Sequence, residues 1–244
     1  MCSHMTTLGF PVTTEQDFRH YVYQASEFGR KIETSKGSYT LWAPGDGIEL
    51  WVQTNLHRRI IGMNPHFRGR ARMRIGLTRY VVRHRHTLLD GALYGWANPA
   101  STDAYPLVFD LPDADTYNKL DLPYLADVQL AAFAQSIKGF ATAETYLAAY
   151  GGDNGSAVET FIPSGLFTAP GKKKEPPQSH ANFSGRVLAT KLLTNPVTGQ
   201  KFYWAMIHTV GGKIDVVADP QVVEGRIVTG GVVQGTFCLS GRLV

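Results

Sequence analysis

One stretch of the sequence concentrates positive charge far more than the rest of the chain. Between Leu50 and Leu89 there are nine arginines, no lysine and no acidic residue. A guanidinium group can bind phosphate or carboxylate through two parallel hydrogen bonds, which an ammonium group cannot do. The block therefore predicts recognition of an anion. Its members are Arg58, Arg59, Arg68, Arg70, Arg72, Arg74, Arg79, Arg83 and Arg85.

Arginines and apolar residues alternate from Arg70 to Ile75. In a strand this period of two places the guanidinium groups on one face and the apolar groups on the other. Aromatic side chains beside such a face could stack on the bases of a single strand. We therefore predict a non-catalytic binding protein that engages single-stranded nucleic acid or another phosphorylated polyanion through this arginine face and a C-terminal β-barrel. The stacking candidates are Trp51, Phe67, Tyr80 and Trp204, with Tyr94 and Trp96 nearby.

An acidic segment follows the arginine block directly. Residues 90–168 contain ten acidic residues and two lysines, although the whole chain has a net charge of +4. Five of the acids lie between Asp110 and Asp127. If this segment folds over the arginines, or meets them in a second copy, the charges cancel without a ligand. The alternative prediction is thus a self-assembly or protein-interaction module that forms a homo-oligomer through its Arg and Asp segments.

A metal site is a third hypothesis. His84 and His86 would project from the same side of a strand, as metal-binding histidine pairs do. However, Arg83 and Arg85 flank the pair and disfavour a dication. A metal-dependent enzyme would be centred on these histidines, with a third ligand drawn from Glu49, His66 or Asp90.

Other catalytic signatures are missing from the sequence. It has no Gly-x-Ser-x-Gly motif, no Walker loop and no dinucleotide-binding fingerprint. Cys238 lies in an apolar, strand-like run, where a buried thiol is expected rather than an activated one. We therefore favour a protein without catalytic activity and expect no cofactor.

The chain carries no sign of membrane insertion or secretion. It has no apolar window of about 18 residues, and the N-terminus lacks a charged region followed by an apolar one. The two cysteines, Cys2 and Cys238, lie at opposite ends. These features predict a cytoplasmic protein with no disulfide framework and no membrane partner.

The N-terminal two thirds of the chain predict an α+β domain over residues 5–168. A helix over about 14–28, with Thr13 or Thr14 as its cap, precedes strands at 31–34, 38–42 and 48–53. Further strands are expected at 70–75, 78–86, 92–97 and 105–111. Residues 122–137 are rich in Ala, Leu and Gln and predict a helix, which would form a helical hairpin over 122–150 with a second helix at 142–150.

The C-terminal third predicts a separate unit. Residues 169–182, rich in proline and lysine, predict a linker. Strands at 183–193, 201–210, 214–218 and 232–243 then predict a small β-barrel of the OB or SH3-like kind over 183–244. The fold class is therefore α+β: a mostly antiparallel sheet with a helix and a helical hairpin, followed by this barrel. Residues 1–4 resemble a cloning remnant and are expected to lie outside the fold.

Overall fold

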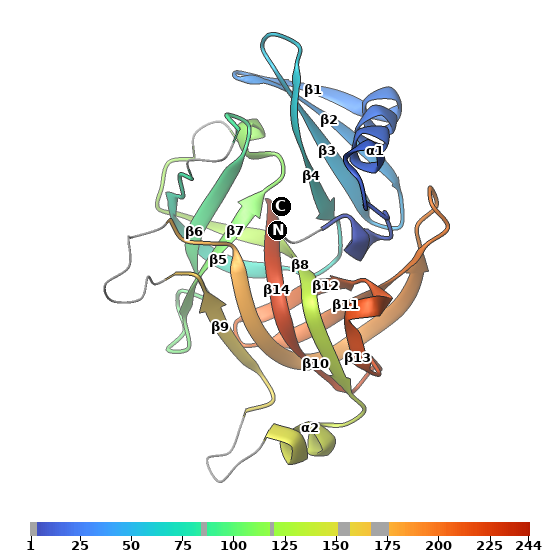
Figure 1. Ribbon diagram of the computed structural model, residues 1–244. Coiled ribbons are helices and arrows are strands. Elements are labelled where there is room, and N and C mark those ends of the chain that lie inside the picture. The colour runs from blue at the N-terminus through green and yellow to red at the C-terminus, as the bar shows by residue number, and fades with distance from the viewer. Residues whose placement is uncertain (1–3, 84–86, 118–119, 151–156, 167–175) are drawn as a thin grey trace, which may run out of the picture.

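The computed structural model describes residues 4–83, 87–117, 120–150, 157–166 and 176–244 (Figure 1). Over these residues the protein is a mixed α+β structure made mostly of strands, with two α-helices, which confirms the fold class at that level. The strands form two sheets, which we call sheet A and sheet B. Within the described ranges, no helix has the length and apolar character that a membrane span requires.

Sheet A is an antiparallel meander of four strands preceded by a helix. Helix α1 (Glu15–Phe28) begins at a capping box, in which the Thr14 hydroxyl accepts from the backbone N–H of Asp17 and the Asp17 carboxylate accepts from that of Thr14. The strands are β1 (Arg30–Thr34), β2 (Gly37–Gly45), β3 (Ile48–Asn55) and β4 (Ile60–Phe67). The helix and the first three strands confirm the prediction, whereas β4 was missed because its Asn64-Pro65 pair is typical of turns.

In the part of the chain that the structure describes, sheet B has ten strands, and β8 and β14 pair through its centre. One edge of β8 pairs with β5, β12 and β13 in turn, and the other edge pairs with β14. The strands β11, β12, β8, β5, β6, β7, β14 and β10 close into a ring of eight through the β10–β11 pair. The bounds are β5 (Met73–Tyr80), β6 (Gly91–Ala97), β7 (Tyr105–Leu111), β8 (Tyr124–Phe140), β9 (Thr160–Ser164), β10 (His180–Thr194), β11 (Lys201–Thr209), β12 (Gly212–Ala218), β13 (Val223–Gly225) and β14 (Val232–Leu243), with helix α2 (Ala143–Tyr150) and the short 3-10 helices η1 (Thr6–Leu8), η2 (Ala114–Thr116) and η3 (Pro220–Val222).

The helix predicted for residues 122–137 is wrong, because these residues form most of β8. The helical hairpin is therefore wrong too, and of its two helices α2 alone is confirmed. Leu130 and Ala132 pack into the core inside the ring, while Ala131 and Phe133 pack on its outer side. A strand buried on both faces has an almost continuous apolar run, which periodicity does not distinguish from a helix. Pairing along both edges then overrides the helix propensity of its alanines.

The strands predicted in the C-terminal third are confirmed as β10, β11, β12 and β14, but they do not form a sheet of their own. β12 and β14 pair with β8, which lies before the predicted linker over 169–182. The linker therefore does not separate two sheets. Its last residues, 180–182, already belong to β10, and residues 167–175 lie outside the described ranges. In the predicted barrel these short strands would have paired only with one another. In the structure β12 and β14 pair with the long strand β8 instead, so their edges are not left open.

Sheet A packs against the outer face of sheet B, and α1 packs on β2 and β3 of sheet A. Leu50 and Val52 of β3 share one buried cluster with Phe133 of β8. The N-terminal segment enters the same interface, since Leu8 is fully buried and the His4 ring stacks on Phe133 with 4.6 Å between the ring centroids. His4 is therefore part of the packed structure, contrary to the prediction for residues 1–4.

Candidate functional site

The outer face of β5 and the residues leading into it carry the predicted row of arginines. Arg70, Arg72 and Arg74 are exposed, whereas Ala71 and Met73 between them are each 1% exposed. The alternation arises because the inner face of β5 packs on the core of the ring while its outer face is open. The predicted alternation is confirmed.

Two aromatic residues of β6 lie on the same outer face. Tyr94 and Trp96 alternate with Leu93 and Ala97, which are buried in the core. The Arg79 guanidinium lies over the Tyr94 ring, 4.1 Å from its centroid, and Trp96 is 40% exposed. We call this set the β5 surface: Arg70, Arg72, Arg74, Arg79, Tyr94 and Trp96.

The acidic segment reaches only part of the arginine block in the described structure. Arg74 pairs with Asp127 at 2.9 Å, and both side chains are about half exposed, at 54% and 51%. The Arg83 side chain is 8% exposed and donates to Asp110. Arg68 lies 3.5 Å from Glu49. Within the ranges that the structure describes, the remaining members Arg58, Arg59, Arg70, Arg72 and Arg79 have no ion-pair partner.

The nine arginines do not form one continuous face. Arg58 and Arg59 occupy the tip of the β3–β4 hairpin, and the eight residues of β4 separate them from Arg68. At about 3.3 Å per residue this strand is roughly 25 Å long, so the tip and the β5 surface are distinct sites. Arg83 is mostly buried, and Arg85 lies outside the described residues.

Burial removes two of the four predicted stacking residues from contact with a ligand. Trp51 is 1% exposed and Phe67 is 4% exposed, so both are core residues. Trp204 is partly buried and donates from Nε1 to Asp215 at 2.9 Å. Tyr80 is 39% exposed and lines a cleft of about 870 Å³ that also includes Tyr117.

The predicted metal site cannot be placed, because His84 and His86 lie outside the described residues. Each proposed third ligand already has partners. The Asp90 carboxylate accepts from the side chains of Gln53 and Asn64, and Glu49 and His66 belong to the contacts described below. Among the described residues, no group of three His, Cys, Asp or Glu side chains could hold a metal ion.

A row of buried polar side chains, which sequence reasoning missed, crosses the interface between the sheets. The Gln129 side chain donates to Asp215 at 3.1 Å, so its oxygen faces Nε2 of His66 at 2.8 Å. Because that oxygen can only accept, Nε2 carries the proton and Nδ1 accepts from the Ser240 hydroxyl at 2.9 Å. We call Asp215, Gln129, His66 and Ser240 the polar row.

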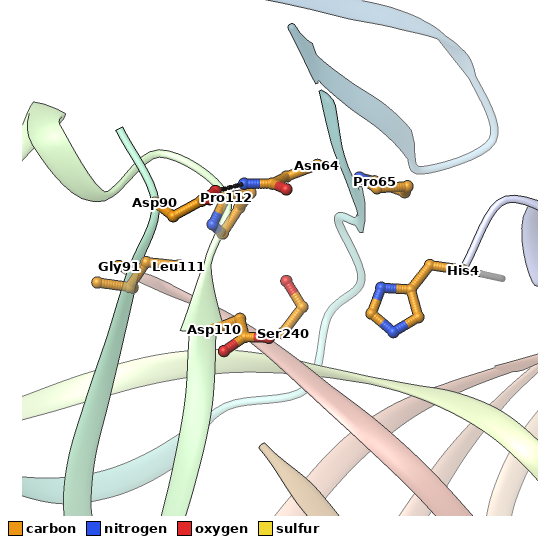
Figure 2. Close-up of a pocket in the computed structure, with 9 residues that line it drawn as sticks. All are labelled: His4, Asn64, Pro65, Asp90, Gly91, Asp110, Leu111, Pro112 and Ser240. Carbon is orange, nitrogen blue, oxygen red and sulfur yellow. Dashed lines mark hydrogen bonds between the residues drawn. The ribbon is translucent and has the colours of Figure 1, made fainter. Parts of the chain in front are cut away.

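Ser240 opens onto a cavity of about 120 Å³, shown in Figure 2 with its lining residues Asn64, Asp90 and Asp110. A serine that donates to a neutral imidazole has the hydrogen bond of a nucleophile and base. However, complete burial lowers the pKa of His66 to about 3, and Gln129 stands where such sites place a carboxylate. The imidazole therefore accepts a proton poorly, and the polar row is better suited to joining the two sheets than to catalysis.

A second polar cluster, with two buried carboxylates and a partly exposed arginine, joins the sheets at the end of β14. Arg242 donates from Nε to Asp113 at 2.9 Å and from Nη1 to Glu49 at 3.3 Å. Its guanidinium also lies 4.7 Å from the centre of the Trp51 ring. Burial raises the pKa of both carboxyl groups, although the attraction of Arg242 opposes the rise. We call Glu49, Asp113 and Arg242 the ion cluster. No sequence pattern pointed to it, because its members are far apart in the chain.

Comparisons with known proteins add no assignment: no family model, no curated protein and no solved structure matches this chain.

Proposed function

We propose that this protein binds a polyanion, specifically single-stranded nucleic acid, on the β5 surface. The observation that carries the proposal is the row of exposed arginines at positions 70, 72 and 74 beside the exposed ring of Trp96. Guanidinium groups bind the phosphates of a strand, and an aromatic ring stacks on its bases regardless of sequence. The β5 surface supplies both kinds of contact within one sheet face.

The charge pattern of the β5 surface supports this proposal. Arg70 and Arg72 have no ion-pair partner in the described part of the chain. The pair between Arg74 and Asp127 is half exposed, and such pairs contribute about 0–1 kcal/mol. A phosphate group can therefore take the place of the Asp127 carboxylate at little cost.

The closed ring of strands is also compatible with the proposal. Small closed sheets, among them OB folds, use an outer sheet face to bind nucleic-acid strands. The Trp204 side chain already donates to Asp215, so we do not propose that it stacks on a base. In this proposal the C-terminal strands support the binding sheet. We place the interaction in the cytoplasm, where single-stranded nucleic acid is available and the buried Cys238 would remain a thiol.

The test is binding of a fluorescein-labelled, 20-nucleotide DNA strand, followed by anisotropy at several salt concentrations. Replacing Arg70, Arg72 and Arg74 together with serine should weaken binding and reduce the slope of log affinity against log salt by about 2, at about 0.7 per lost phosphate contact. The control, with Lys191, Lys201 and Arg226 replaced by serine, removes the same charge from exposed positions elsewhere. Unchanged affinity in the first variant would show that the proposal is wrong.

Self-assembly is the competing proposal, and it rests on the complementary charge of the two segments. Asp127 and Asp110 pair with Arg74 and Arg83 within one chain, so assembly would need the acidic residues that are left over. The exposed Asp103 and Asp121 could pair in the same way with a second copy. Light scattering at low and high salt separates the two proposals. An oligomer that dissociates in salt and has no affinity for the labelled strand would favour assembly.

The third hypothesis is a metal-dependent enzyme centred on His84 and His86. Stoichiometric metal in elemental analysis would favour it.

A further inference from the structure

The tip of the β3–β4 hairpin is a second exposed surface with a chemistry of its own. In Figure 1 this hairpin is the uppermost part of the molecule. Its tip carries Leu56, Arg58, Arg59 and Ile60, of which Leu56 is 71% exposed and Ile60 is 51% exposed. Two large aliphatic side chains therefore stand in solvent beside two arginines.

The tip is held in one conformation by its own hydrogen bonds. The Asn55 side-chain oxygen accepts from the backbone N–H groups of His57 and Arg59, each at 3.0 Å. The backbone of Asn55 also bonds to that of Arg58 and Arg59, each at 2.9 Å. A fixed turn presents its side chains without further ordering when it binds, which favours association.

The charge of the tip is uncompensated within the described structure. Neither Arg58 nor Arg59 has an ion-pair partner among the described residues, and the nearby Lys36 is paired with Asp115 at 2.9 Å. No acidic residue occurs between Leu50 and Leu89. The tip therefore combines positive charge with apolar side chains, which is the combination that binds an anionic lipid surface.

We propose that the hairpin tip docks on the anionic headgroups of a lipid bilayer, with Leu56 and Ile60 entering the boundary of the acyl chains. Aliphatic side chains gain by leaving water for hydrocarbon, whereas they offer no ring to stack on a base. Nucleic acid fits the β5 surface better, because that surface has aromatic rings beside its arginines. The docking is peripheral, so it needs no membrane span, but it departs from the prediction of no membrane partner. It is a function separate from the binding of a nucleic-acid strand.

The experiment is co-sedimentation of the full chain with vesicles of phosphatidylcholine, with and without about one third phosphatidylserine. The wild-type protein should sediment with the anionic vesicles and remain in solution with the neutral ones. An Arg58→Gly, Arg59→Ser variant should lose about 25-fold in affinity, at about fivefold for each basic residue near the surface. Glycine suits position 58, where the backbone has a φ of 59°, so the turn should be kept.

A second variant, Leu56→Ser with Ile60→Ser, should lose about tenfold or more, because it removes the apolar contribution and leaves the charge unchanged. The matched control is Arg70→Ser with Arg72→Ser, which removes two charges from the β5 surface and should bind vesicles within twofold of wild type. Equal losses in the control and the tip variants would overturn the inference, as would failure of the wild type to bind anionic vesicles.

Binding of the labelled DNA strand by the tip variants provides the remaining outcome of the experiment. If the tip variants lose affinity for the labelled DNA strand and not for vesicles, the tip belongs to a nucleic-acid site and the lipid inference is wrong. Because the two surfaces are tested with different probes and different substitutions, failure of lipid docking leaves the proposal for the β5 surface untouched, and the reverse also holds.

Discussion

Replacing Arg242 with methionine should destabilise the protein by about 3–5 kcal/mol near pH 7.5, the usual cost of breaking a buried ion pair from one side. The guanidinium contacts Glu49 and Asp113, whose side chains are each 2% exposed. Methionine keeps much of the apolar volume but donates no hydrogen bond. Both buried carboxylates would lose their principal counterion, since the neighbouring Arg68 is 68% exposed and lies 3.5 Å from Glu49.

The loss should depend on pH in a defined direction. Burial raises the pKa of Glu49 and Asp113 in the folded protein. A carboxyl group whose folded pKa exceeds its unfolded value destabilises the fold above the folded pKa, and this effect disappears as the pH falls toward the unfolded value of about 4. Without Arg242 both pKa values should rise further. The difference from wild type should then shrink toward pH 5, by at most about 1.4 kcal/mol per pH unit for each proton bound.

The measurement is urea unfolding of wild type and variant at pH 7.5, 6 and 5, followed by tryptophan fluorescence. Arg74→Met is the matched control, because Arg74 makes a half-exposed pair with Asp127 that contributes at most about 1 kcal/mol. The control should show only a small loss at each pH. A loss below about 1 kcal/mol in the Arg242 variant, or one that is the same at all three pH values, would refute the reasoning.

Three further predictions concern other parts of the molecule. Gly69→Ala should lower the melting temperature by an amount equivalent to a few kcal/mol, because an added Cβ would lie 2.0 Å from the buried Asp215 carboxylate; a calorimetric loss under about 1 kcal/mol would contradict this. Burial lowers the pKa of His66 to about 3 from an ordinary 6.5, so the unfolded chain binds a proton that the fold excludes. Stability should therefore fall by up to about 1.4 kcal/mol per unit as the pH drops from 6.5 toward 3, and His66→Gln should lose that part of the dependence in urea titrations. Trp96→Ala should weaken DNA-strand binding by about 1–3 kcal/mol in anisotropy with little change in melting temperature, and equal affinity would argue against stacking.

Local patterns predicted much of the secondary structure. The helix at residues 15–28 follows from its capping residues and from apolar side chains at helical spacing, both of which lie within one short segment. The alternation from Arg70 to Arg74 likewise predicted which side chains would be exposed. These features depend on neighbours in the chain, so the sequence is sufficient to find them.

The burial of the aromatic candidates could not be predicted in the same way. Trp51 was expected to face a ligand, but both faces of β3 are covered: Leu50 and Val52 by the packing against sheet B, and Trp51 by Tyr39 and Leu89. A strand covered on both faces has no solvent side, whatever its own pattern suggests. No local pattern in the sequence indicated that Tyr39 and Leu89 would cover the second face of β3.

The sequence by itself determined the capped helix, most of the strands and the concentration of arginine without acid between Leu50 and Leu89. The tertiary structure alone decided that residues 124–140 are a strand, that Arg83 is buried against Asp110, and that Glu49 meets Arg242 at the far end of the chain. The physical reason is that propensity and periodicity act between neighbouring residues. Burial and charge pairing depend instead on which distant strands share an edge or a face, and the closing of a long-range sheet sets those pairings.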